Sequence, residues 1–300
     1  MIDPKLETLL KVYETNSFTR AAEQLSLTQP AVSQHIRQLE KDLNIKIFNR
    51  VEKSLKLTAE GEIVIKYAKR IKMLYDNMQQ KIHDEKLHTT RLTVGITHTS
   101  ESNIVAEVLA KYCNTNTGIR ITIISDTINN LYTKLTNYEV DLAIVEGNVV
   151  NPNFSSILLD TDCLVLIVSD NNKLAKKNFV TINDLKKEKM ILRLPNSGTR
   201  NLFLAHLESN NMSIDEFNVI MEVDNIATIK DLIRRDFGVS ILAKSACLDE
   251  IKKKKLTALP VENLSMIRDV NIIYHNDFEH VNILQNIVKM YNETSKLYNY

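Results

Sequence analysis

The sequence predicts an α+β protein of several domains: a small helical domain first, then a long helix, then a larger α/β domain. Three observations support this prediction. Apolar residues recur at helical spacing in three short segments that end before residue 45. A further helical pattern continues from residue 59 to about residue 89. From Arg91 onwards, runs rich in Ile, Val and Leu alternate with helical stretches, as in α/β layers with mainly parallel sheets.

The composition is typical of a globular chain, and the net charge is close to zero. Hydrophobic residues make up 44% and charged residues 25% of the 300 positions, and 38 basic against 37 acidic residues leave a net charge of +1. Any anionic partner must therefore meet a local basic patch. We find neither a signal segment nor an apolar run of about 18 residues, as a membrane span needs, and expect a cytoplasmic protein without membrane contact. The scattered cysteines predict reduced thiols without an assigned role: Cys113, Cys163 and Cys247.

Three short helices are predicted in the first 44 residues. Asp3, Ser17 and Thr28 are each placed to cap the start of one of them. Pro30 is tolerated in the third helix because it falls in the first turn, where its missing N–H has no intrahelical partner. Helices this short bury little alone, so we expect them to share one core.

The third helix has an inner and an outer face. Val32, Ile36 and Leu39 form an apolar stripe, whereas the opposite face is polar. A helix fits the DNA major groove, where Gln can pair with adenine and Arg with guanine. The pattern therefore indicates a helix-turn-helix. A helical bundle whose polar face meets only water would show the same periodicity. The outer face consists of Pro30, Ser33, Gln34 and Arg37.

The segment from Ile45 to Gly61 predicts a two-stranded hairpin, because apolar residues alternate on both sides of a polar turn. From Thr28 to Lys56, six basic residues outnumber three acidic ones. Basic side chains at a hairpin tip can reach phosphates or the minor groove and give salt-dependent affinity. The alternative interpretation is a solvated turn.

The run from Leu6 to Gly61 resembles the DNA-binding domain of LysR-type transcriptional regulators. The resemblance is carried by "SFTRAAEQL", by "QPAVSQHIRQLE", and by "IFNR" and "LTAEG" where the family has "LFxR" and "LTxxG". Gln34 stands where the family often has Arg, and Asn44 where it usually has Gly, which Asn can replace because it tolerates the left-handed conformation. The resemblance implies a winged helix-turn-helix over residues 1–58 whose DNA contacts are Thr28, Gln29, Pro30, Ser33, Gln34, Arg37, Arg50 and Lys53.

Residues 59–89 predict a long helix, capped by Thr58, that links two domains and dimerises. Its apolar residues are spaced alternately by four and three, as in a short coiled-coil seam, although a core helix would look similar. The resemblance favours dimerisation, since the family's linker helix dimerises at this place. Two recognition helices would then bind half-sites of an approximately palindromic double-stranded DNA operator. The family also implies a dimer of dimers, with RNA polymerase as a candidate partner. The seam consists of Val64, Ala68, Ile71, Tyr75, Met78 and Ile82.

By the same resemblance, residues 90–300 form an effector-binding domain similar to periplasmic binding proteins. It would have two βαβ subdomains around a cleft, the first about 90–161 and 268–300, the second about 162–267. Helical stretches are predicted at Ser102 to Tyr112 and Ile226 to Arg235.

Two polar stretches, "THTS" and "LPNSGTR", follow predicted strands and precede helices. Ligands of open α/β sheets bind at the carboxyl ends of strands, often on helix N-termini that favour anions. Taken alone, such residues are as readily explained as helix caps. The resemblance favours effector contacts, and the "THT" element is similar to that of the sulfur-assimilation branch, which binds oxyanions. We therefore expect a small anionic effector, held by Thr97, Thr99, Ser100, Asn196, Ser197 and Thr199.

No catalytic constellation is recognisable. The six glycines are too scattered for a dinucleotide fingerprint or a P-loop, and neither G-x-S-x-G nor H-E-x-x-H occurs. His275 and His280 are five residues apart, which misses the spacing of ligands on one helix face. We therefore expect a ligand-responsive transcription factor and no enzyme, with neither a cofactor nor a metal. The alternative is a small-molecule-binding protein whose DNA-binding domain is not controlled by the effector.

Overall fold

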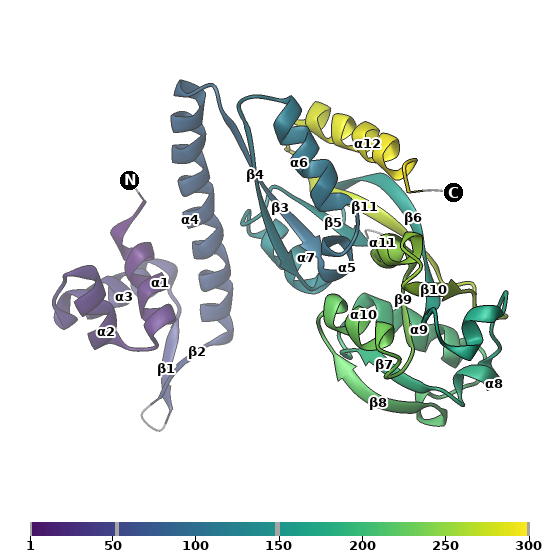
Figure 1. Ribbon diagram of the computed structural model, residues 1–300. Coiled ribbons are helices and arrows are strands. Elements are labelled where there is room, and N and C mark those ends of the chain that lie inside the picture. The colour runs from purple at the N-terminus through teal and green to yellow at the C-terminus, as the bar shows by residue number, and fades with distance from the viewer. Residues whose placement is uncertain (1, 52–53, 148–150, 299–300) are drawn as a thin grey trace. The chain divides into compact units, whose positions relative to one another are not determined.

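The chain divides into two compact units, described here from a computed structural model over residues 2–51, 54–147 and 151–298 (Figure 1). Unit 1 comprises Met1–Thr89 together with Asn137–Glu139, and unit 2 comprises Thr90–Thr136 together with Val140–Tyr300.

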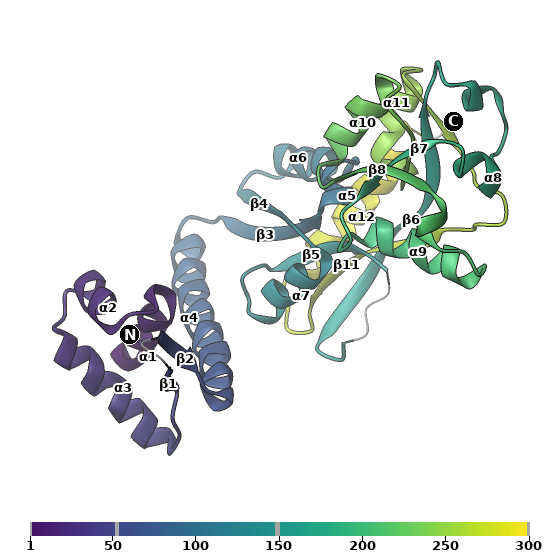
Figure 2. The ribbon, with the colours of Figure 1, turned by 90° about the horizontal axis from the view of Figure 1, so that it is seen from below.

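Unit 1 contains a group of three short helices, a hairpin and a long helix (Figure 2). The predicted caps are confirmed, because Asp3, Ser17, Thr28 and Thr58 each accept a hydrogen bond from a backbone N–H two or three residues further on. The elements are α1 (Pro4–Thr15), α2 (Phe18–Leu25), α3 (Gln29–Leu43), β1 (Phe48–Val51), β2 (Ser54–Leu57) and α4 (Ala59–Lys86).

Helix α3 ends as its sequence predicts. Asn44 adopts the left-handed conformation, with φ 53° and ψ 43°, and its N–H bonds back to the carbonyls of Glu40 and Lys41. Asn accepts this conformation at lower cost than most residues with a Cβ. The inner face of α3 is also confirmed, since Val32 and Ile36 are at most 3% exposed in the core of unit 1.

The predicted seam of the long helix α4 is wrong in its first half. Ala68 is 1% exposed and Val64 packs on the same core, because the first turns of α4 close the helical group. The large apolar residues that α4 leaves exposed keep Ile71, Met78 and Ile82 of the predicted seam and add three others. We call this row the exposed face of α4: Ile63, Tyr67, Ile71, Leu74, Met78 and Ile82.

Unit 2 has α/β architecture, with a seven-stranded and a two-stranded sheet among its described residues. Its elements are β3 (Thr90–Thr97), α5 (His98–Glu101), α6 (Val105–Thr115), β4 (Ile119–Asp126), α7 (Ile128–Thr136), β5 (Leu142–Glu146), β6 (Phe154–Ser169), η1 (Lys173–Lys176), α8 (Ile182–Leu185), β7 (Lys189–Arg193), α9 (Gly198–Ser209), η2 (Ile214–Glu216), β8 (Asn218–Val223), α10 (Ile226–Arg234), β9 (Ser240–Ala243), η3 (Lys244–Cys247), α11 (Leu248–Lys252), β10 (Leu256–Leu259), β11 (Ile267–His275) and α12 (Val281–Ser295).

The seven-stranded sheet is mixed, and the expectation of mainly parallel pairing is wrong. Strands β4, β3 and β5 pair in parallel, but β11 pairs antiparallel with both β5 and β6. Strand β6 is long, and it pairs antiparallel with β11 as far as Cys163 and with β9 and β10 from Leu164 onwards. One continuous strand thus joins the two halves of unit 2.

The helix expected from Ser102 begins later. Thr97 caps the short helix α5, and the chain then leaves the helical conformation until Val105, whose N–H donates to the side chain of Asn103 at 2.8 Å.

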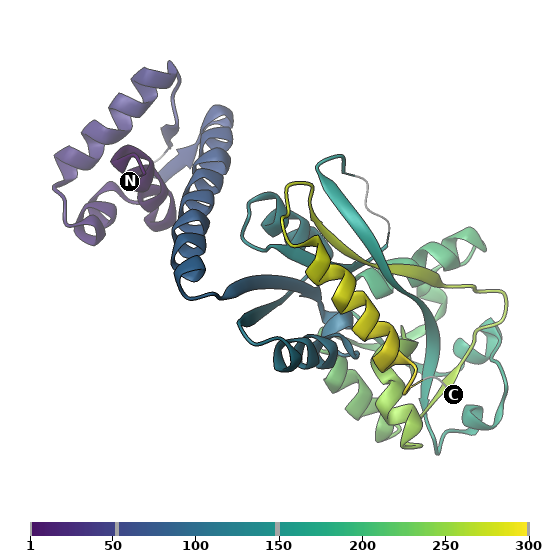
Figure 3. The same ribbon diagram turned by 90° about the horizontal axis from the view of Figure 1, so that it is seen from above.

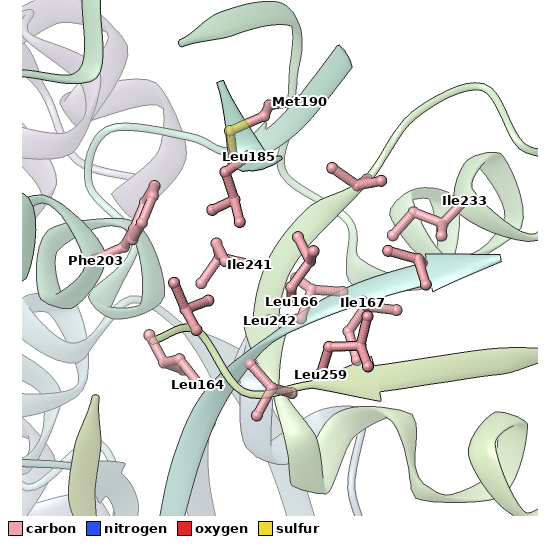
Figure 4. Packing of buried hydrophobic residues seen from close by; sticks show 14 of the residues in the cluster. Leu164, Leu166, Ile167, Leu185, Met190, Phe203, Ile233, Ile241, Leu242 and Leu259 are labelled. Carbon is pink, nitrogen blue, oxygen red and sulfur yellow. The ribbon is translucent and has the colours of Figure 1, made fainter. Parts of the chain in front are cut away.

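Helices cover both faces of the first half of the sheet. Val94 and Ile144 pack beneath α6 and α12, which lie side by side (Figures 1 and 3), whereas the neighbouring Ala143 and Val145 pack against α7. This alternation follows from the two-residue period of a strand. The second half has its own core, in which Leu166 of β6 lies among side chains of β9 and β10 (Figure 4).

Candidate functional site

The outer face of α3 carries the residues predicted to contact DNA. Thr28, Gln29, Pro30, Gln34 and Arg37 are exposed, and Ser33 is half-buried. The Gln29 side-chain amide donates a hydrogen bond to the Ser33 hydroxyl at 2.9 Å. Because the opposite face of α3 is buried in the core, this polar face is fixed toward the outside of unit 1.

Of the two predicted hairpin contacts, Arg50 lies in β1, where its backbone pairs with Leu55. Lys53 lies outside the described residues.

Glu40 connects α3 to the hairpin, a role that the sequence alone did not indicate. Its side chain is 10% exposed, one oxygen accepts the backbone N–H of Ile47 at 2.9 Å, and the other is 2.8 Å from the Lys46 ammonium. Burial raises the pKa of Glu40, but the hydrogen bonds from Lys46 and Ile47 outweigh it and hold this pKa below its usual value. The charge of Glu40 therefore fixes the base of the hairpin beside the polar face.

Gly61 allows α4 to start directly against the hairpin base. A Cβ at this position would overlap the carbonyl group of Ile47. The same carbonyl accepts the backbone N–H of Thr58 at 3.0 Å. Only glycine permits this close approach of two backbones.

Unit 2 contains a cavity of about 270 Å³ at the carboxyl ends of its parallel strands. Four of the predicted effector residues line it, namely Thr97, Thr99, Asn196 and Ser197. The other two lie just behind the wall among buried atoms. Ser100 is fully buried, and Thr199 is 2% exposed with a hydroxyl oxygen that has no hydrogen-bond partner.

Four charged residues of the cavity wall were missed in the sequence. Asp126, Glu146 and Arg193 are the last residues of β4, β5 and β7, and Asp224 directly follows β8. Their common signal is position, since each stands where a predicted strand ends. Ligands bind at this edge of α/β sheets, so the last residue of each strand would have identified them.

Glu146 forms a hydrogen-bonded group with the "THTS" element. The Thr97 hydroxyl donates to Glu146 Oε1 at 2.6 Å and the Ser100 hydroxyl at 3.4 Å. Arg268 of β11 lies behind them, with Nη2 4.0 Å from Glu146 Oε1 and 3.7 Å from Asp162 Oδ2. Each of these charged side chains is at most 6% exposed, so their charges interact strongly.

Arg193 faces this group from β7. Its side chain is 3% exposed, and Nη2 donates to Asp224 Oδ1 at 3.2 Å. Burial lowers the pKa of Arg193 and Asp224 counteracts this, so the guanidinium stays charged. The N-terminus of α9 lies in the same wall, where Ser197 caps the helix by accepting the N–H of Arg200 at 3.2 Å. Helix N-termini favour negative charge.

No group of three or more His, Cys, Asp and Glu side chains in residues 2–51, 54–147 and 151–298 is arranged to hold a metal ion. No helix within these residues has the length and hydropathy needed to cross a bilayer.

Two protein-family models match the chain, one for each unit. Residues 4–62 match the bacterial regulatory helix-turn-helix protein, lysR family, and residues 85–295 match the LysR substrate binding domain.

Individual proteins are similar over most of the chain. A probable RuBisCO transcriptional regulator of Phaeodactylum tricornutum is 28% identical over 277 residues, covering 91% of this chain and 90% of that protein. CbnR, solved with its target DNA, is 16% identical with a TM-score of 0.69, covering 97% of this chain and 98% of CbnR. The CcmR regulatory domain of Synechocystis PCC6803, solved with 2-PG, is 20% identical with a TM-score of 0.59, covering 68% of this chain and 97% of that domain. At these identities the two structures show a common fold.

Proposed function

The chain belongs to the LysR family of transcriptional regulators, and from this premise we propose that α3 reads an operator sequence while the cavity of unit 2 binds the controlling effector. In this proposal, residues 1–58 bind DNA, residues 59–89 link the two domains and dimerise, and residues 90–300 bind the effector.

The polar face of α3 is the observation that carries the DNA-binding part. Gln29, Gln34 and Arg37 are exposed on a helix whose other face is held in a core. Gln and Arg can each pair bidentately with one base in the major groove. Arg50 and Lys53 of the hairpin would bind the phosphate backbone and set the register of α3. CbnR, which shares the fold, was solved with its target DNA.

Dimerisation would use the exposed face of α4. Six large apolar side chains along one helix are unusual for a surface that meets only water, and contiguous apolar patches mark interaction sites. Two copies paired through this face would present two α3 helices to an approximately palindromic operator. A dimer of dimers and a contact with RNA polymerase would extend this arrangement.

The effector would bind in the cavity, between subdomains of about 90–161 with 268–300 and 162–267. Thr97, Asp126 and Glu146 belong to the first of these, and Arg193 and Asp224 to the second. A ligand that touches both halves stabilises one relative arrangement over others, which is how binding would shift the equilibrium between DNA-binding shapes. The predicted anionic group would bind Arg193 and the N-terminus of α9.

A titration of the full-length protein against the DNA that flanks its own gene tests the regulator. Measured at two salt concentrations with random DNA as competitor, tight and salt-sensitive binding that resists the competitor supports the proposal. Binding to every tested genomic fragment with the affinity of random DNA would contradict it.

A further inference from the structure

We propose that the effector is a small amino carboxylate, whose ammonium group binds Glu146 and whose carboxylate binds Arg193 in the cavity of unit 2. This inference rests on the proposed function of the cavity as the effector site, and it adds a cationic group to the anionic one predicted from the sequence.

The charge of the cavity wall disfavours a ligand that is only an anion. Three carboxylates line the cavity, those of Asp126, Glu146 and Asp224, against the single guanidinium of Arg193. Asp126 is partly neutralised by Lys134 at 3.8 Å and by hydrogen bonds within its own turn. Asp224 pairs with Arg193 and is 59% exposed to solvent, so Glu146 is the carboxylate that a simple oxyanion would meet in a poorly screened part of the cavity.

Glu146 has a free oxygen for a cationic group. Its contacts with Thr97, Ser100 and Arg268 all fall on Oε1, and no other described residue donates to Oε2. The side chain is 4% exposed, yet it lies in the cavity wall. Oε2 is therefore the oxygen on which a ligand in the cavity can act. An ammonium group supplies both a donor and the opposite charge.

Arg193 offers the matching site for a carboxylate. Of its three nitrogens, Nη2 bonds Asp224, Nε is buried without a partner, and no described residue accepts from Nη1. Asp224 is 59% exposed, so its ion pair with Arg193 is weakened by solvent and can be replaced by a ligand carboxylate. The guanidinium can bind that carboxylate through two parallel hydrogen bonds.

The two sites are close enough for one small molecule. Glu146 and Arg193 both line this one cavity. The cavity of about 270 Å³ lies at the lower limit of the ~300–1,000 Å³ common for ligand pockets. Thr97 and Thr99 also line the space, and the Thr97 hydroxyl holds Glu146 in place by donating to Oε1 at 2.6 Å. These dimensions fit a single amino acid rather than a peptide.

Ligand binding to the full-length protein tests the inference by thermal shift and calorimetry. The probes are the twenty standard α-amino acids and the ω-amino acids from glycine to 6-aminohexanoate. Each is compared with its carboxylate lacking the amine, and sulfate and phosphate are added. We expect at least one amino carboxylate to bind about tenfold or more tightly than its deaminated analogue, because that analogue leaves Glu146 unpaired.

Glu146→Gln adds a second readout, because the amide keeps the size of the side chain and can still accept from Thr97. We expect it to weaken the amino carboxylate about tenfold or more, whereas the deaminated analogue, relieved of repulsion by the carboxylate, should bind more tightly than it does to wild type. The exposed control Glu262→Gln should change neither affinity. If no amino carboxylate binds, or if every simple anion binds as tightly, the inference is wrong. Operator binding by the same preparation would then still support the regulator, so the two failures are distinguishable.

Discussion

The carboxylate of Glu40 in α3 accepts the backbone N–H of Ile47 at 2.9 Å, immediately before strand β1. This contact joins the helix that carries the polar face to the hairpin that carries Arg50. The helix and the hairpin proposed to contact DNA are thereby held together, which would lower the conformational cost of binding.

Replacing Glu40 by Gln should destabilise unit 1 and loosen the hairpin. The substitution removes the charge beside Lys46 and weakens the bond to Ile47, so we expect a loss of about 1–3 kcal/mol. Hydrogen exchange measured on peptides that span residues 45–57 should become faster. Glu23→Gln, at an exposed position of α2, serves as the control. Unchanged exchange in the Glu40 variant would contradict this role.

The contribution of Glu40 should depend on pH. Its pKa is lowered below the ordinary value of 4.5, so its stabilising effect is complete above that pH and disappears as the pH falls through the lowered folded value. The free energy of unfolding should therefore differ between wild type and Glu40→Gln at neutral pH, and this difference should shrink below about pH 4. A difference that stayed constant across this range would show that the charge is not responsible.

Gly61→Ala should destabilise the junction between the hairpin and α4. The new Cβ overlaps the Ile47 carbonyl, so either backbone must move, at a cost of about 1–3 kcal/mol or more. Weaker DNA binding should accompany the lower melting temperature of unit 1. Glu60→Ala, in the same turn but exposed, should have little effect on either measurement. If both variants were equally stable, the close approach at Gly61 would not matter.

A charge on the exposed face of α4 should reduce self-association. Met78 is 48% exposed in the single chain, and Met78→Glu would place a carboxylate in the proposed apolar interface. Sedimentation equilibrium should show a smaller oligomer for this variant, whereas Gln79→Glu, one residue away and off that face, should keep the wild-type mass. The same mass for all three proteins would place the dimer interface elsewhere.

The sequence predicted the elements whose cause is local. Caps such as Thr28 and turns such as Asn44 depend on neighbouring backbone groups, and the apolar stripe of α3 repeats with the period of one helix. The hydroxyls of Thr97 and Ser197 were found because they follow a strand and precede a helix.

The remaining features depend on which segments meet in space. Ala68 has the spacing of a coiled-coil seam, but it is buried because the start of α4 packs on the three short helices. Glu146 and Arg193 are far apart in the sequence and end strands of two different sheets, so only the packing of the two halves of unit 2 brings them to one cavity. The composition of β6 also does not indicate that this one strand pairs in both halves of unit 2.

The most direct test of the account compares the affinity of Gln29→Ala for the operator with its affinity for random DNA of the same length. Both affinities are measured at the same salt concentration. If Gln29 pairs with a base, the variant should lose about 1–3 kcal/mol on the operator and almost nothing on random DNA. Gln285→Ala, an exposed glutamine of α12, should bind both as wild type does, and Lys53→Ala should weaken both alike. Equal losses of Gln29→Ala on the two DNAs would contradict the claim that α3 reads the sequence.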